Sequence, residues 1–102
     1  MNECKKNILH KLERGKKLCN IVVEHTNEGK KVPLNVVNVL TNIKISIVED
    51  LQQKEILESL GYIEYYFTVE YVKSLDDMLE NVKKMNEAIE LRDLLDSIKE
   101  GN

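Results

Sequence analysis

The chain has 102 residues, of which 42 % are hydrophobic and 32 % charged, and its formal net charge is −3. This length is typical of one domain, so we expect residues 1–102 to fold as a single unit. No apolar run approaches the roughly 20 residues of a membrane span, and the N-terminal residues lack the apolar segment of a signal peptide. We therefore expect an intracellular protein, cytoplasmic or in the host cytoplasm if viral, with no membrane partner.

The charge is divided unevenly along the chain. Residues 1–44 carry nine Lys or Arg against four Glu, whereas residues 45–102 carry six Lys or Arg against fourteen Asp or Glu. A polarised chain of this kind is typical of proteins whose basic part engages a partner, or whose copies associate head to tail. The basic candidates for contact with nucleic acid are Lys5, Lys6, Lys11, Arg14, Lys16, Lys17, Lys30 and Lys31.

The first segment predicts an amphipathic helix. Its less polar residues recur at intervals of three and four, as on one stripe of a helix: Cys4, Ile8, Leu12, Gly15, Cys19, Val22 and Thr26. Gly15 is expected either to allow close approach of a neighbour or to end a shorter helix. The β-branched residues in 18–26 leave a strand open as an alternative.

Gly29 suits the left-handed position after a helix, and Pro33 suits the first turn of the next one. The same residues could form a hairpin between 18–26 and 30–38. Beyond them, a helical stripe is predicted at Val36, Leu40, Ile43, Ile47 and Leu51, although residues 43–47 also alternate as a strand would.

Residues 46–60 predict a helix that ends at Gly61. Ser46 and Glu49 fit a capping box, which allows a helix break near 44–46. Residues 62–72 then alternate with a period of two and hold all four tyrosines, so this segment is the best strand candidate. A helical alternative through Tyr62, Tyr66, Val69 and Val72 remains open.

The clearest helix is predicted over about 75–99, with Ser74 and Asp77 at its start. One apolar stripe runs through Leu75, Met78, Leu79, Val82, Met85 and Ile89. A second stripe, rotated to another side, consists of Leu91, Leu94, Leu95 and Ile98. Because such a helix touches two surfaces, we expect one stripe to pack inside the domain and the other to meet a partner.

Together these segments predict a mainly α fold, a small helix-turn-helix-like or bundled domain with at most a short β segment near 62–72 and a long C-terminal helix. An α+β fold with strands near 18–26, 31–38, 43–48 and 62–72 is the alternative.

No constellation for chemistry is recognisable in the sequence. The carboxylates have the spacing of solvated helix faces, the glycines form no phosphate-binding loop, and the two cysteines and two histidines lack the spacing of zinc ligands. We therefore expect no enzyme, no catalytic or metal site, no cofactor and no small-molecule substrate.

Residues 34–72 follow a rhythm of helix, short polar break at Thr41-Asn42, second helix, and Leu60-Gly61-Tyr62-Ile63. This rhythm resembles the winged helix-turn-helix family. The resemblance implies a DNA-binding regulator with a wing after Gly61 and a long terminal helix for dimerisation. The acidic second helix would be repelled by DNA, so contact would fall to the basic N-terminal half.

The leading hypothesis is a non-enzymatic protein–protein interaction module that forms a homo-oligomer or docks on another protein. From the type of chain, we expect a viral, phage or mobile-element accessory protein. The candidate partner-binding residues are Tyr65, Tyr66, Tyr71, Leu91, Leu94, Leu95 and Ile98. The rival hypothesis is a winged-helix-like transcriptional regulator that uses the basic residues named above.

Overall fold

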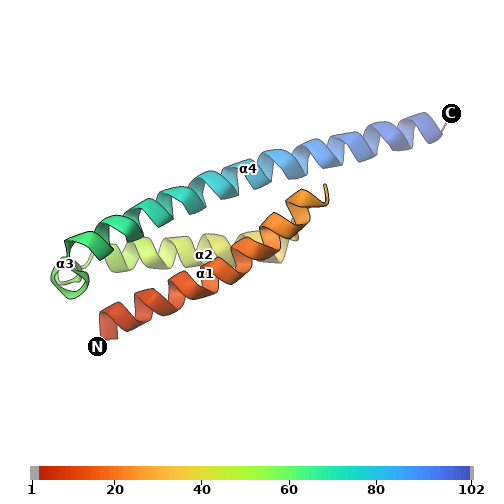
Figure 1. Ribbon diagram of the computed structural model, residues 1–102. Coiled ribbons are helices and arrows are strands. Elements are labelled where there is room, and N and C mark those ends of the chain that lie inside the picture. The colour runs from red at the N-terminus through yellow and green to blue at the C-terminus, as the bar shows by residue number, and fades with distance from the viewer. Residues whose placement is uncertain (1–2, 102) are drawn as a thin grey trace.

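A computed structural model describes residues 3–101. It contains four helices: α1 (Glu3–Asn27), α2 (Leu34–Leu51), α3 (Ile56–Leu60) and α4 (Tyr62–Glu100). Figure 1 shows α1 and α2 beside the first part of α4, whose C-terminal end continues past both of them. The molecule is accordingly elongated, with extents of 64 × 19 × 19 Å.

The mainly helical prediction is confirmed, and the α+β alternative is wrong. No strand occurs within residues 3–101, so none of the four proposed strand segments forms one. A strand needs a neighbouring strand to satisfy its backbone hydrogen bonds, and each candidate neighbour is helical.

Helix α1 is continuous through Gly15, so the shorter helix and the strand at 18–26 are both excluded. Its buried residues are Ile8, Gly15 and Val22, which all belong to the predicted stripe. The helix ends in a Schellman motif: the Lys30 N–H donates to the His25 carbonyl at 2.9 Å, and the Gly29 N–H donates to the Thr26 carbonyl at 3.1 Å. Gly29 has the positive φ, 68°, that this motif requires.

Helix α2 begins at Leu34, directly after Pro33, and is continuous to Leu51. The break predicted near 44–46 is therefore wrong, and Ser46 does not cap a helix. The chain instead leaves the helix over 52–55. The predicted stripe is confirmed, because the buried residues of α2 are Val36, Leu40, Ile43 and Ile47.

The expectation of a strand or extended segment at 62–72 is wrong, because α4 begins at Tyr62 rather than near Leu75. The Ser74 hydroxyl donates to the Glu70 carbonyl within the helix, at 3.1 Å, so Ser74 is not an N-cap. The helical alternative for this segment is confirmed. Of the residues that defined it, Tyr62 and Tyr66 are exposed and Val69 and Val72 are half-buried, whereas Thr68 is buried.

Two apolar clusters hold the helices together. The larger one joins α1, α2, α4 and the loop before α2, with the buried residues Val22, Val32, Val36, Leu40, Leu75 and Val82. The smaller one joins the start of α1 to α3, with Ile8, Ile56 and Leu60. The α1 and α4 backbones hardly approach each other, because both pack mainly on α2 and α3. This arrangement leaves a groove between α1 and α4.

Candidate interaction surfaces

The first apolar surface is at the start of α4. Tyr62, Ile63, Tyr66 and Phe67 are exposed by 80, 73, 59 and 64 %. The Tyr66 and Phe67 rings meet edge to face, with centroids 5.5 Å apart, which is a favourable aromatic arrangement. We call these four residues the aromatic patch. Among these four residues, only Tyr66 belongs to the candidate partner-binding residues predicted from the sequence.

The second apolar surface is at the other end of the same helix. Leu91, Leu94, Leu95 and Ile98 are each exposed by 56 or 57 %. We call these four residues the leucine patch. Every residue of α4 from Leu91 onward is exposed, because this part of the helix extends past α1 and α2. The first predicted stripe, in contrast, faces the domain, with Leu75 and Val82 buried.

Tyr65 and Tyr71, the other two candidate tyrosines, are half-buried. Tyr65 is half-buried against the cluster of Ile8, Ile56 and Leu60. Tyr71 is half-buried against the larger cluster, and its hydroxyl donates to the Leu12 carbonyl at 3.4 Å.

Tyr71 and Cys19 perturb each other inside the domain. Burial, with the neighbouring Cys19 as a smaller cause, raises the pKa of Tyr71 to about 12. Burial also raises the pKa of the Cys19 thiol, although a hydrogen bond with Tyr71 opposes the rise. The thiol therefore stays neutral at physiological pH, as expected of a structural cysteine rather than a nucleophile.

A groove lies between α1 and the first half of α4. Its volume is about 410 Å³, and most of its lining is apolar, including Ile8, Leu12, Leu60, Phe67 and Tyr71. Phe67 thus belongs both to the aromatic patch and to the edge of the groove.

Several of the predicted nucleic-acid contacts form ion pairs within the chain. Lys5 pairs with Glu64, Lys11 with Asp50, Lys30 with Glu28, and Lys31 with Glu90. The exposed Lys6, Arg14, Lys16 and Lys17 form no ion pair with other residues in 3–101. The basic candidates are thereby divided into two sets, and the unpaired one lies on α1.

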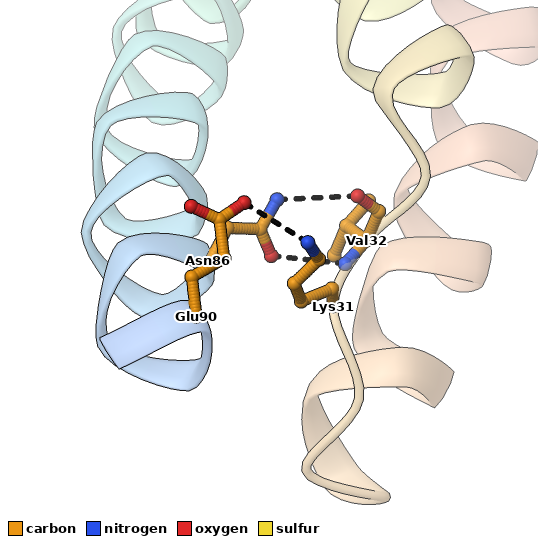
Figure 2. A network of polar contacts seen from close by, with 4 residues as sticks. All are labelled: Lys31, Val32, Asn86 and Glu90. Atoms are coloured by element: carbon orange, nitrogen blue, oxygen red, sulfur yellow. Dashed lines mark hydrogen bonds and ion pairs between the residues drawn. The ribbon is translucent and has the colours of Figure 1, made fainter. Parts of the chain in front are cut away.

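One contact between distant segments was not predicted from the sequence. Figure 2 shows the Asn86 side chain reaching from α4 to the loop before α2, where its oxygen accepts from the Val32 N–H at 3.0 Å and its nitrogen donates to the Val32 carbonyl at 3.1 Å. The nearby Lys31–Glu90 ion pair, at 2.9 Å, joins the same two elements. The sequence contains one hint of this contact: Asn86 lies one helical turn after Val82, beside the predicted apolar stripe.

Within residues 3–101, no group of three or more His, Cys, Asp or Glu side chains could hold a metal ion. None of the described helices is long and apolar enough to cross a membrane. Comparison of the chain with protein-family models, with curated proteins and with solved structures finds no match.

Proposed function

We propose that this protein is a non-enzymatic protein–protein interaction module that works as a homo-oligomer. The observation that carries the proposal is the exposure of the leucine patch on a helix end that projects from the domain. Burying a Leu or Ile side chain fully is worth about 1.5–3 kcal/mol, so covering four that are half-exposed would favour association by several kcal/mol. Exposed apolar patches of this kind are typical of interaction sites.

Light scattering coupled to size-exclusion chromatography tests the proposal. Over protein concentrations from about 1 µM to about 500 µM, we expect the molar mass to rise above the 11.9 kDa of one chain. Replacing two leucines of the patch with a good helix former, Leu94→Gln with Leu95→Gln, should return the mass to that of a monomer.

The matched control is Arg92→Gln with Asp93→Gln, which leaves the net charge unchanged and alters the opposite side of the same exposed helix end. This control should associate as the unmodified chain does. A monomer at every concentration would contradict the proposed homo-oligomer.

A second candidate function, DNA binding, is supported by the unpaired basic residues Lys6, Arg14, Lys16 and Lys17 on α1. In this candidate the chain would be a regulator like the winged helix-turn-helix proteins, although residues 62–72 contain no wing strand. Gel shift with mixed duplexes at increasing salt tests it. Binding at low salt that weakens with Lys16→Glu plus Lys17→Glu would support the candidate, and no binding at low salt would contradict it.

A further inference from the structure

The face of α4 that points away from the domain carries part of each apolar patch. The residues of α4 that point into the domain are Thr68, Leu75 and Val82, which lie within about 40° of one another at 100° per residue. At the same 100° per residue, another set of α4 residues points in roughly the opposite direction, at intervals along the helix. We call it the outer face, and its residues are Tyr62, Tyr66, Glu70, Lys73, Asp77, Glu80, Lys84, Ala88, Leu91, Leu95 and Ile98.

All residues of the outer face except the half-buried Glu70 are exposed. Apolar side chains occupy its two ends, and mostly charged side chains occupy its middle. One helix face therefore offers Tyr62 and Tyr66 of the aromatic patch and Leu91, Leu95 and Ile98 of the leucine patch, at opposite ends of 39 residues. Such a face is a candidate interface for an elongated partner of the same length.

The residues of this face are complementary about the middle of the helix. Tyr66 lies as far before the point between Glu80 and Asn81 as Leu95 lies after it, and the same holds for Ile63 and Ile98. Nearer the middle, Asp77 and Lys84 are related in the same way. At these positions, reversing the helix direction exchanges apolar with apolar residues and acidic with basic ones. The same reversal exchanges Leu91 with Glu70 and Tyr62 with Lys99, so the complementarity is confined to the pairs named above.

We propose that two copies of the chain pair through the outer faces of antiparallel α4 helices, around a two-fold axis that passes between Glu80 and Asn81. This inference rests on the proposed homo-oligomer and specifies its interface. Tyr66 packs against the partner's Leu95, and Asp77 faces the partner's Lys84. Because a two-fold axis repeats each contact, Tyr66 and Leu95 of both copies are covered and the assembly closes as a dimer.

The alternatives fit these residues less well. A parallel pair would place Asp77 against the partner's Asp77 and Lys84 against the partner's Lys84, so like charges would face each other. In the unpaired chain Lys84 contacts Glu80 at 3.6 Å, and both side chains are exposed by more than 60 %. This surface ion pair is weak, so Lys84 can exchange it for Asp77 of a second copy at little cost.

Directed crosslinking tests the direction and register of the pairing. In chains whose native cysteines are replaced (Cys4→Ser, Cys19→Ala), one variant carries Tyr66→Cys and another carries Leu95→Cys. On mixing and mild oxidation, we expect a disulfide between the two variants, because only facing residues approach within the roughly 4.4–6.8 Å between Cα atoms that a disulfide needs. Each variant alone should stay uncrosslinked, since two copies of one site lie at opposite ends of the dimer.

Charge reversal provides a second measurement that does not depend on cysteines. Asp77→Lys and Lys84→Asp each convert two attractive contacts into repulsive ones, so each should weaken self-association by about tenfold. An equimolar mixture of the two variants should regain the affinity, because each restores the opposite charge in the other. Lys83→Asp, at the neighbouring exposed lysine off the outer face, is the matched control for Lys84→Asp and should have a smaller effect.

Circular dichroism should confirm that each variant remains helical. Efficient self-crosslinking of the Leu95→Cys variant would overturn the antiparallel direction. A dimer by light scattering that forms no mixed disulfide and does not respond to charge reversal would overturn this interface and leave the homo-oligomer standing. A monomer by light scattering would overturn both.

Discussion

At the scale of single residues, two side chains of α4 hold the other elements in place. Asn86 is the first: its amide binds both the N–H and the carbonyl of Val32 (Figure 2), as a neighbouring backbone would. Val32 is a core residue with only 2 % of its surface exposed. The two hydrogen bonds therefore hold the loop between α1 and α2 in a position that buries Val32.

We expect Asn86→Ala to lower the free energy of unfolding by about 1–2 kcal/mol, because two partly buried backbone groups lose their partner. Urea denaturation measures the change. Asn38→Ala, on the exposed side of α2, is the matched control, since it makes the same gain in helix propensity without removing a side-chain hydrogen bond to another residue in 3–101. Equal stability of the two variants would contradict the role of Asn86.

Tyr71 is the second such residue, and its position explains why a glycine occupies position 15. A Cβ atom at Gly15 would overlap the Tyr71 hydroxyl, while the rest of the tyrosine ring would be in ordinary contact. Gly15 therefore marks the point where a side chain of α4 reaches the backbone of α1. This contact supports the close-approach explanation of Gly15 over the helix-stop explanation.

We predict that the effect of Gly15→Ala on the free energy of unfolding depends on whether residue 71 is Tyr or Phe. With Tyr71 present, the overlap with its hydroxyl offsets or exceeds the gain of about 1 kcal/mol in helix propensity. With Tyr71→Phe, the overlap is gone and the same substitution should stabilise the chain by up to about 1 kcal/mol. A double-mutant cycle by urea denaturation checks this coupling, and additive effects would contradict it.

At the scale of elements, the start of α4 depends on Gly61. This residue joins α3 to α4 with φ 85° and ψ 159°, a conformation that is essentially restricted to glycine. Its N–H donates to the Leu57 carbonyl at 2.8 Å, and its carbonyl accepts from the Tyr65 N–H at 3.0 Å. Gly61 therefore ends one helix and lets the next begin immediately.

Gly61→Ala should lower the free energy of unfolding by about 1–3 kcal/mol, because alanine is strained in this conformation. Gly29→Ala, at the other positive-φ glycine, provides the comparison and should cost about 1 kcal/mol. In both cases the added methyl group meets open space, so the cost comes from the backbone alone. Thermal or urea denaturation that ranks Gly29→Ala as the costlier change would contradict this explanation.

At the scale of the whole molecule, the uneven distribution of charge along the sequence is partly compensated inside the fold. Lys5, Lys11, Lys31 and Lys44, from the basic part of the chain, pair with Glu64, Asp50, Glu90 and Asp76 from the acidic part. The two parts thus attract each other within one copy. Of the described basic part, residues 3–44, Lys6, Arg14, Lys16 and Lys17 on α1 form no ion pair with other residues in 3–101.

The Lys11–Asp50 pair should contribute most, since its side chains are only 28 and 22 % exposed. We expect Asp50→Asn to cost about 1 kcal/mol of unfolding free energy, and Glu90→Gln, in a pair that is 46 and 60 % exposed, less than about 0.5 kcal/mol. Raising the salt from about 0.05 M to about 0.5 M should remove most of the Glu90→Gln effect and less of the Asp50→Asn effect. Urea denaturation at both salt concentrations measures the difference.

The sequence alone determined the helical stripes, because periodicity reports which face of a helix avoids water. The stripes of α1 and α2 could be predicted for this reason. The helix ends at Gly29 and Gly61 could be predicted because glycine readily adopts the positive φ found at both positions. The sequence also separated the two apolar sides of α4, at Leu75 to Ile89 and at Leu91 to Ile98. The function of the exposed side stays a prediction.

Only the tertiary structure decided the state of residues 62–72, because their pattern fits both a strand and a helix. A strand at this position would have lacked a partner, whereas the helix continues directly into α4 and buries Thr68. The tertiary structure also decided which tyrosines lie at the surface, and it joined Asn86 to Val32 and Gly15 to Tyr71. These are contacts between segments distant in sequence, and local periodicity carries no information about them.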